Sequence, residues 1–358
     1  MDLYPLARPF LRCIEPEAAH RLTIAALKLG LVAGAREPGD PILACNVLGL
    51  QFPNPIGLAA GFDKDAEVSD AMLALGFGFV EAGTVTPRPQ PGNPGKRIYR
   101  LDEDEAVINR LGFNNQGLTA FAGRLAQRKR EGRRGIVGAN VGKNRDTEAI
   151  GDYIAGIEAL CGLADYLVVN LSSPNTPGLR ALQARSEMED LVAQVIEARR
   201  RAAPDRMRPP PILAKVGPDL GDHELRDIAE VALKNGIDGL IVGNTTIDRP
   251  PHLRSRDRNA SGGLSGRPLM APSTACLAAM YRHVKGSIPI IGCGGVANGA
   301  DAYAKIKAGA TLVQLYSALV FHGPALVGQI KRDLAARLRA DGFASVSDAV
   351  GADNKNFA

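Results

Sequence analysis

Eight short apolar runs, separated by stretches of helical pattern, constrain the fold of this sequence more than any other feature. Each run is almost continuously apolar, as expected of a strand that is buried on both faces in a parallel sheet. The runs span residues 56–60, 77–85, 135–141, 166–171, 212–216, 239–242, 288–291 and 312–316. Helical patterns lie between most of them, for example at 186–203, 222–235, 273–284 and 301–308. This alternation predicts an α/β fold, a (β/α)8 TIM barrel, with a doubly wound sheet as the alternative.

Charge and cysteine usage exclude several classes of partner. The formal net charge is +5, and arginine clusters at 199–208 and 249–258 are interpreted as solvated loops. Aromatic residues make up only 5% and Trp is absent, so we expect no nucleic-acid partner. Five cysteines without a CxxC pair argue against a disulfide framework or a metal site. Nothing in the sequence implies an obligate protein partner.

The first 40 residues differ in character from the rest. A short amphipathic helix and a second, rather apolar helix are predicted, the second beginning at Pro16 and Glu17. They are interpreted either as a plug at one end of the main domain or as an interfacial anchor on a lipid surface. No run of eighteen apolar residues occurs, so no spanning helix is expected. We therefore divide the chain into a helical segment at 1–40, a barrel at 41–340 and a loose C-terminal tail at 341–358.

Polar side chains follow almost every predicted strand at its carboxyl end, where barrels carry their chemistry. Gly294 and Gly295 follow the seventh strand, and a helix expected to begin near Asn298 would direct N–H groups at an anion. A second glycine-rich loop lies at 262–266. Together these loops predict a phosphate site.

Two lysines, Lys64 and Lys215, are predicted to point into the mouth of the barrel and to stabilise developing negative charge. Four amides equipped to read a planar amide ring accompany them: Asn109, Asn170, Asn175 and Asn244. No histidine lies at a strand end, and Asp63 is at least as well explained as the cap of a turn. A hydroxyl is therefore the leading candidate for the proton acceptor.

At these positions the sequence resembles the dihydroorotate dehydrogenase family. The matching runs are GLAAGFDKD at 57–65, GTVTPRPQPG at 83–92, NRLGFNN at 109–115, NLSSPNTPGLR at 170–180, GGLSGRP at 262–268 and GCGG at 292–295. The resemblance covers about residues 40–330 and implies a TIM barrel that carries one non-covalent FMN. Ser173 stands where the quinone-using class has its serine base and the soluble classes have cysteine, and that class also adds an N-terminal helical segment.

The resemblance also implies roles for individual residues. Ser173 would take the proton from C5 of dihydroorotate while hydride leaves C6. FMN contacts are implied at Ala60, Gly61, Thr84, Asn140, Asn170, Lys215, Gly243, Gly266, Gly295, Tyr316 and Ser317. Substrate contacts are implied at Lys64, Asn109, Arg110, Leu111, Gly112, Phe113, Asn170, Asn175, Asn244 and Thr245. His20 and Arg100 resemble residues that line a quinone tunnel.

The expected function is therefore the oxidation of dihydroorotate to orotate in pyrimidine synthesis, with electrons passed to a membrane quinone. The expected location is peripheral, on the cytoplasmic face of a bacterial-type inner membrane. Three alternatives remain at this point. They are another FMN barrel with a soluble acceptor, a sugar-phosphate aldolase or isomerase that uses the lysines for a Schiff base, and a scaffold on the membrane surface.

Overall fold

Eight parallel strands form a closed barrel in the computed structural model, which describes residues 4–32, 39–203 and 208–357. The strands are β3 (Ile56–Leu58), β4 (Phe79–Val85), β7 (Ile136–Val141), β8 (Tyr166–Asn170), β9 (Ile212–Val216), β10 (Gly239–Val242), β12 (Ile290–Cys293) and β13 (Leu312–Leu315). Neighbours along the chain pair in parallel, and β13 pairs with β3 through Val313 and Ile56. The eight predicted runs are therefore the barrel strands, and the doubly wound alternative is excluded.

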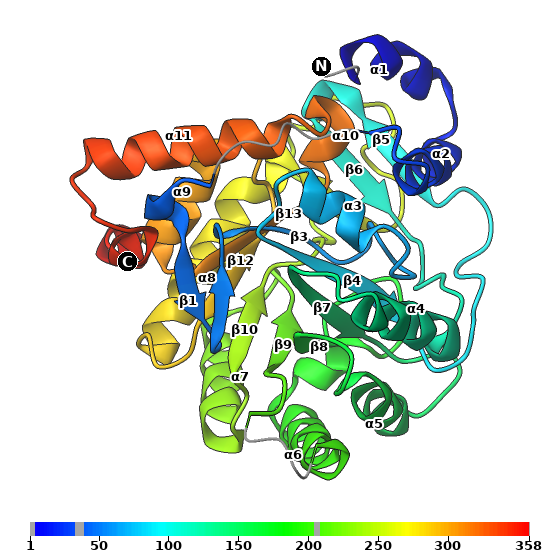
Figure 1. The fold of residues 1–358 in the computed structure, drawn as a ribbon, viewed down its shortest axis with the longest axis vertical. Helices are drawn as coiled ribbons and strands as arrows, with labels where there is room; N and C mark the ends of the chain where they lie inside the picture. Colours follow the sequence, from blue (N-terminus) through cyan, green and yellow to red (C-terminus); the bar gives the residue numbers. More distant parts are fainter. Residues whose placement is uncertain (1–3, 33–38, 204–207, 358) are drawn as a thin grey trace.

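Helices surround the barrel (Figure 1). They are α3 (Ser69–Ala74), α4 (Leu118–Arg130), α5 (Ala149–Leu160), α6 (Arg185–Ala202), α7 (Asp222–Asn235), α8 (Met270–Val284), α9 (Gly299–Ala308), α10 (Ala318–His322) and α11 (Leu326–Ala340). The four predicted helices are confirmed as α6 to α9. Local signals explain α7, where Glu224 caps the first turn and Gly236 ends the helix in the left-handed conformation.

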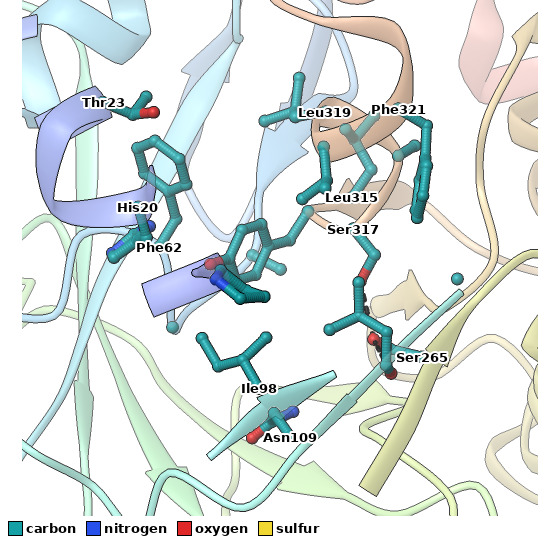
Figure 2. Close-up of a pocket in the computed structure, with 18 of the residues that line it drawn as sticks. His20, Thr23, Phe62, Ile98, Asn109, Ser265, Leu315, Ser317, Leu319 and Phe321 are labelled. Carbon is teal, nitrogen blue, oxygen red and sulfur yellow. Dashed lines mark hydrogen bonds between the residues drawn. The ribbon is translucent and has the colours of Figure 1, made fainter. Parts of the chain in front are cut away.

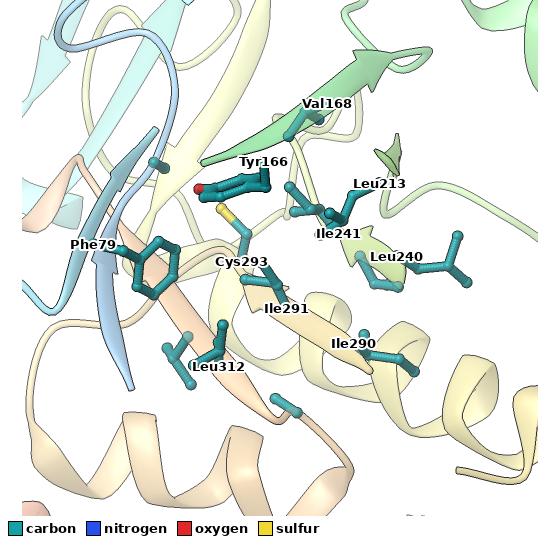
Figure 3. Close-up of a cluster of buried hydrophobic side chains, with 14 of the residues drawn as sticks. Phe79, Tyr166, Val168, Leu213, Leu240, Ile241, Ile290, Ile291, Cys293 and Leu312 are labelled. Atoms are coloured by element: carbon teal, nitrogen blue, oxygen red, sulfur yellow. The ribbon is translucent and has the colours of Figure 1, made fainter. Parts of the chain in front are cut away.

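Large side chains fill the interior of the barrel. Phe79 and Tyr166 lie there with ring centroids 6.3 Å apart, close to Cys293 and Leu312 (Figure 3). A Cβ on Gly138 would lie 2.1 Å from the Tyr166 ring, so this glycine makes room for the aromatic side chain. The barrel is a packed core at this level, and open space begins only toward the carboxyl ends of the strands.

Two further sheets cover the ends of the barrel, and neither is predicted from the apolar runs. The hairpin of β1 (Cys45–Val47) and β2 (Leu50–Phe52) places Phe52 against Phe79, with ring centroids 5.3 Å apart. The other sheet has the order β11–β6–β5, from β5 (Ile98–Leu101), β6 (Ala106–Asn109) and β11 (Gly263–Gly266). Its strands come from loops after β4 and β10, so it lies at the mouth.

The N-terminal segment forms two helices beside this second sheet, as Figure 1 shows. They are α1 (Tyr4–Cys13) and α2 (Pro16–Lys28), which confirms the two predicted helices and the start of the second at Pro16. The rest of the segment, residues 1–3 and 33–38, lies outside the described residues. Among the helices described, none has the length and hydropathy needed to cross a membrane.

The C-terminal residues differ from the expected loose tail. Short 3-10 turns at Val346–Ala349 and Asn354–Phe357 follow α11, and Val346 and Ala349 are buried. The buried Asn354 side chain donates to Ala278 O of α8 at 3.0 Å and to Ala308 O at the end of α9 at 2.6 Å. The polar composition of this segment therefore reflects hydrogen bonding to helix carbonyls, and the segment is packed.

Candidate active site

A cavity of about 650 Å³ extends from the strand ends to the two N-terminal helices. Its polar part is lined by groups from the barrel loops, and its other part by apolar side chains of α1, α2, β5 and α10. Figure 2 shows this second part, with His20 and Phe62 on one side and Leu319 and Phe321 on another. The cavity therefore joins the barrel mouth to the N-terminal segment in one space.

The amides predicted at the mouth converge there. Asn175 Nδ2 donates to Asn109 Oδ1 at 3.2 Å, so the loop after β8 is tied to β6. Asn244 Nδ2 donates to Ser172 Oγ at 2.9 Å, and Asn170 Nδ2 donates to Thr84 Oγ1 at 3.0 Å. These hydrogen bonds fix the orientation of each amide before any ligand binds.

Ser173 lies among these amides and is buried in the wall of the cavity. Its Oγ accepts the backbone N–H of Asn175 at 3.4 Å. Two hydroxyl groups near it, Thr176 Oγ1 and Thr245 Oγ1, are buried and lack a hydrogen-bond partner within the described part of the chain. Buried polar atoms are normally paired, so the unpaired hydroxyl of Thr245, which lines the cavity, fits a polar ligand at this position.

Lys64 supplies a cation to the same cavity. Burial lowers its pKa to about 8, although the nearby carboxylates of Glu17 and Asp65 act in the opposite direction. A lysine with such a pKa is charged at neutral pH and loses its proton in mildly alkaline solution. It is suited to binding an anionic group of a ligand.

Lys215, from β9, also lines the cavity but has a different environment. Its Nζ lies 3.4 Å from Oε1 of Glu81, which is completely buried inside the barrel. Burial alone would lower the pKa of Lys215, but the attraction of Glu81 outweighs burial and raises it. Lys215 therefore stays positively charged, which favours stabilisation of negative charge and disfavours a nucleophilic amine.

The glycine-rich loops come together as predicted. Gly266 and Gly295 line the cavity together with Ser317, whose Oγ lies 2.8 Å from Ser265 Oγ (Figure 2). Gly295 has φ +79°, and a Cβ there would lie 2.3 Å from the backbone of Met270. These glycines therefore allow close approach of backbone segments around a space where a phosphate would fit.

The helix after these glycines begins at the predicted position but is capped by its own residues. The Asn298 side chain accepts the N–H of Asp301 at 2.8 Å, and the Asp301 carboxylate accepts the N–H of Ala297 at 3.0 Å. One N–H group of the helix that was expected to face an anion, that of Asp301, is thus already used, and so is the N–H of Ala297 just before the helix. An anion here would depend mainly on the glycine loops and on Ser317.

The apolar part of the cavity contains the two residues predicted for a quinone tunnel. His20 packs between Phe62 and Tyr316, and burial, with a smaller effect of Lys64, lowers its pKa to about 3. Arg100 lines the cavity, but its guanidinium donates to three carbonyls at the end of α1. Arg100 therefore connects β5 to the end of α1.

Most predicted site residues line the cavity, namely Ala60, Gly61, Thr84, Leu111, Gly112, Phe113, Thr245 and Tyr316 with those described above. Three do not. Asn140 lies behind the wall and bonds Thr84 and Glu81, Gly243 packs against Cys293 O, and Arg110 donates to Lys96 O and Pro94 O on the surface.

Asp63 caps the turn that leads into α3, as expected from one of the two interpretations of its position in the sequence. Its carboxylate accepts the N–H groups of Glu67 and Val68 and the hydroxyl of Ser69, all at the start of α3. It is buried and does not line the cavity. Asp63 therefore positions the loop that carries Lys64.

Two features of the site were missed from the sequence. Glu81 interrupts an otherwise apolar strand, and an acid in a buried strand requires a partner, so Lys215 on another buried strand was a usable signal. The ion pair of Glu17 on α2 with Arg97 before β5 joins the N-terminal segment to the mouth. Nothing in the local pattern of either residue indicates that they meet.

Comparisons with known proteins agree with this geometry. A family model described as Dihydroorotate dehydrogenase matches residues 42–338. A protein of Azorhizobium caulinodans described as "Dihydroorotate dehydrogenase (quinone)" is 64% identical over 354 residues, 99% of each chain. One of Xanthobacter autotrophicus with the same description is 63% identical over 355 residues, again 99% of each chain.

Solved structures are similar over nearly the same extent. The crystal structure of DHODH from Eimeria tenella in complex with ferulenol has a TM-score of 0.92 at 43% identity, covering 95% of this chain and 96% of that chain. The ligand-free structure from the same organism has a TM-score of 0.90 at 44% identity, covering 94% and 99%.

Proposed function

Because this chain belongs to the dihydroorotate dehydrogenase family, we propose that its cavity serves the quinone-dependent form of that reaction. The protein oxidises dihydroorotate to orotate and passes the electrons to a quinone, a step of pyrimidine biosynthesis. The observation that carries the proposal is the single cavity in which a buried hydroxyl, Ser173, lies among converging amides and the Lys64 cation. The same cavity continues into an apolar part beneath the N-terminal helices.

The residues at the mouth fit FMN as the cofactor. The glycine loops with Ser317 would hold the phosphate, and Lys215 with Asn170 and Thr84 would meet the polar edge of the ring. When bound, FMN supplies the two-electron redox chemistry that no side chain of this site can supply. The unpaired Thr245 hydroxyl is consistent with a polar ligand in this space.

The remaining chemistry depends on the chain's own side chains. Lys64 would bind the carboxylate of dihydroorotate, and Asn109, Asn175 and Asn244 would bind its ring amides. Ser173 Oγ would accept the proton from C5. A serine is a weak base at neutral pH, and the buried Thr176 hydroxyl lies in the same loop as a relay for the proton. Activity should therefore rise in alkaline solution until Lys64 is deprotonated.

The apolar part of the cavity is the proposed route of the quinone. It runs between α1, α2 and the second sheet, so residues 1–40 would form the tunnel and residues 41–340 the catalytic barrel. Exposed side chains of this segment are unusually apolar for a water-exposed surface: Leu6, Phe10 and Leu29 are 72%, 75% and 74% exposed, and Leu22 and Leu31, which also border the cavity, are 52% and 69% exposed. Such a face supports peripheral binding to a membrane, for which we propose the cytoplasmic leaflet.

Anaerobic mixing tests the proposal directly. The purified protein should be yellow, and addition of dihydroorotate without oxygen should bleach the flavin absorption. A short-chain quinone added afterwards should restore the colour. A colourless protein that cannot be reconstituted with FMN would contradict the proposed function, as would a flavin that dihydroorotate leaves unchanged.

A further inference from the structure

A buried carboxylate behind the wall of the cavity has no part in the mechanism above. Glu81, from β4, has no exposed surface. It accepts hydrogen bonds from Asn140 Nδ2 at 2.7 Å, from Gln314 Nε2 at 2.6 Å and from Lys215 Nζ at 3.4 Å. Tyr166 OH lies 3.5 Å from Glu81 Oε2, the oxygen that also accepts from Gln314. One side chain therefore connects β4 to β7, β8, β9 and β13.

Stability of the fold does not explain this arrangement. Barrel interiors are usually filled by branched apolar side chains, and a buried ion pair is often replaceable by apolar residues without loss of stability. Here the ion pair is also oriented relative to the cavity, because Lys215 lines the cavity whereas Glu81 lies behind it. The positive end of the pair faces the ligand space.

Another buried lysine shows what Glu81 contributes. Lys305 is as completely buried as Lys215, but it donates to two hydroxyls, Ser273 Oγ at 2.8 Å and Thr274 Oγ1 at 3.1 Å. Burial lowers the pKa of Lys305 to about 8. The pKa of Lys215 is raised instead, because Glu81 lies beside it.

The other titratable groups near Lys215 do not replace this carboxylate. Cys293, from β12, faces Lys215, and burial raises the pKa of its thiol. Tyr166, from β8, lies beside Glu81, and burial together with that carboxylate raises the pKa of its phenol well above the ordinary value. Both side chains are therefore neutral near neutral pH, and Glu81 supplies the negative charge beside Lys215.

We propose that Glu81 is a positioning residue that holds the Lys215 ammonium charged and in place, and thereby sets the reduction potential of bound FMN. The proposal rests on the proposed function, because it requires a flavin at the mouth of the barrel. Lys215 stabilises the negative charge that the cofactor gains on reduction, and Glu81 acts on the cofactor through Lys215.

Potentiometric titration of the FMN-loaded protein tests the proposal, comparing the parent with Glu81→Gln over a range of pH. In mildly acidic solution Lys215 is charged in both proteins, and loss of the carboxylate should make the potential of the variant more positive. In alkaline solution Lys215 of the variant should be neutral, and the potential should fall below that of the parent. The difference between the two proteins should thus change sign with pH.

A purely structural role predicts a different result. Loosening of the site would shift the potential by an amount that does not depend on pH, and two parallel profiles would overturn the proposal. Gln314→Met is the matched control, because it removes a neutral partner of Glu81 and leaves Lys215 paired, so its profile should parallel the parent. Adding Lys215→Met to Glu81→Gln should abolish the sign change.

Two further measurements keep the test decisive. If Glu81→Gln does not fold, Glu81→Asp should give a smaller change of the same kind, since the carboxylate remains but lies farther from Lys215. Profiles parallel to the parent would again overturn the proposal.

Bleaching of the parent by dihydroorotate is measured first. A parent that bleaches while all profiles stay parallel contradicts the role of Glu81 alone, and a parent without flavin contradicts the proposed function.

Discussion

The ring of His20, from α2, stands edge-on against the ring of Phe62, from the loop after β3, with centroids 5.2 Å apart and an interplanar angle of 89°. Phe62 makes the same kind of contact with Tyr316 at 5.5 Å. The N-terminal segment therefore reaches the strand ends through a series of edge-to-face aromatic contacts. The imidazole belongs to the wall of the cavity.

Stability should depend on His20 in acid. Burial lowers its pKa in the folded protein to about 3, whereas an unfolded chain has a value of about 6.5. The unfolded state therefore binds the proton first, and the free energy of unfolding should decrease as the pH falls from about 6.5, by up to about 1.4 kcal/mol per pH unit. His20→Gln should flatten this decrease in urea titrations, whereas the exposed His223→Gln should not. Parallel slopes for all three proteins would contradict the assignment.

Replacement of Ser173 should separate catalysis from cofactor binding. Ser173→Ala should retain FMN but lower turnover by about 10²- to 10⁴-fold, the usual contribution of a general base. Ser172→Ala is the control, because Ser172 bonds Asn244 and Asn170 from behind the cavity wall and should cost much less. Single-turnover bleaching by dihydroorotate measures the step directly. Equal rates for the parent and Ser173→Ala would contradict the proton-acceptor role.

The pKa of Lys64, about 8, predicts an alkaline limit for substrate binding. A lysine is charged below its pKa, so kcat/KM for dihydroorotate should fall as the pH rises through this value. Lys64→Arg should move the fall to higher pH, because a guanidinium stays charged. Lys64→Gln should remove it and lower kcat/KM by about 10- to 100-fold near neutral pH, the range expected for a charged hydrogen bond. If kcat/KM of Lys64→Gln still fell at the same alkaline pH, the fall would belong to the titration of another group.

Arg100 should matter to the quinone and not to dihydroorotate. It donates to Leu11 O at 2.7 Å, Arg12 O at 2.7 Å and Ile14 O at 2.9 Å, where α1 ends. Arg100→Met should raise KM for a quinone by about tenfold or more, since hydrogen bonds from a charged group are lost. The bleaching rate should stay within about twofold, because no chemical step requires this side chain.

Arg12→Met is the control for that experiment, because the pair of Arg12 with Asp102 is exposed and should contribute about 0–1 kcal/mol. It should leave both half-reactions nearly unchanged. Equal loss of bleaching and of quinone reduction in Arg100→Met would show that Arg100 supports the whole site and has no separate role in the tunnel.

Membrane binding should depend on exposed side chains of α1. Leu6 and Phe10 are 72% and 75% exposed, and burial of each in lipid contributes about 1.5–3 kcal/mol. Leu6→Gln with Phe10→Gln should therefore weaken co-sedimentation with phospholipid vesicles by about 100-fold or more, with little change in stability. Leu233→Gln, on α7, should bind as the parent does. Unchanged vesicle binding in the double variant would place the lipid contact elsewhere.

The barrel could be predicted because strands buried on both faces leave a direct trace in the sequence, as at Ile212–Val216. Helix boundaries could be predicted where capping residues were present, as at Asn298 before Gly299. The second sheet could not be predicted in this way. Its strands Ile98–Leu101 and Ala106–Asn109 are only partly buried and mix polar with apolar residues, and they are held by pairing to a distant segment.

The candidate site was predictable where strand ends impose positions, as for Ser173, Lys64 and Lys215. It was not predictable where a side chain can point either inward or along the surface. Arg110 follows β6 directly, but nearby carbonyls attract its guanidinium to the surface. Glu81 was missed because hydropathy averaged over its strand conceals one acid whose partner lies on another strand.

The sheet at the mouth limits how the acceptor side of this protein can be altered. Leu264 of β11 pairs with Ile108 of β6, although the two strands belong to different insertions of the barrel. Grafting one insertion from a relative without the other would leave main-chain amides and carbonyls exposed at a free edge. A redesigned preference for electron acceptors therefore has to come from individual side-chain replacements, or from exchange of both insertions together.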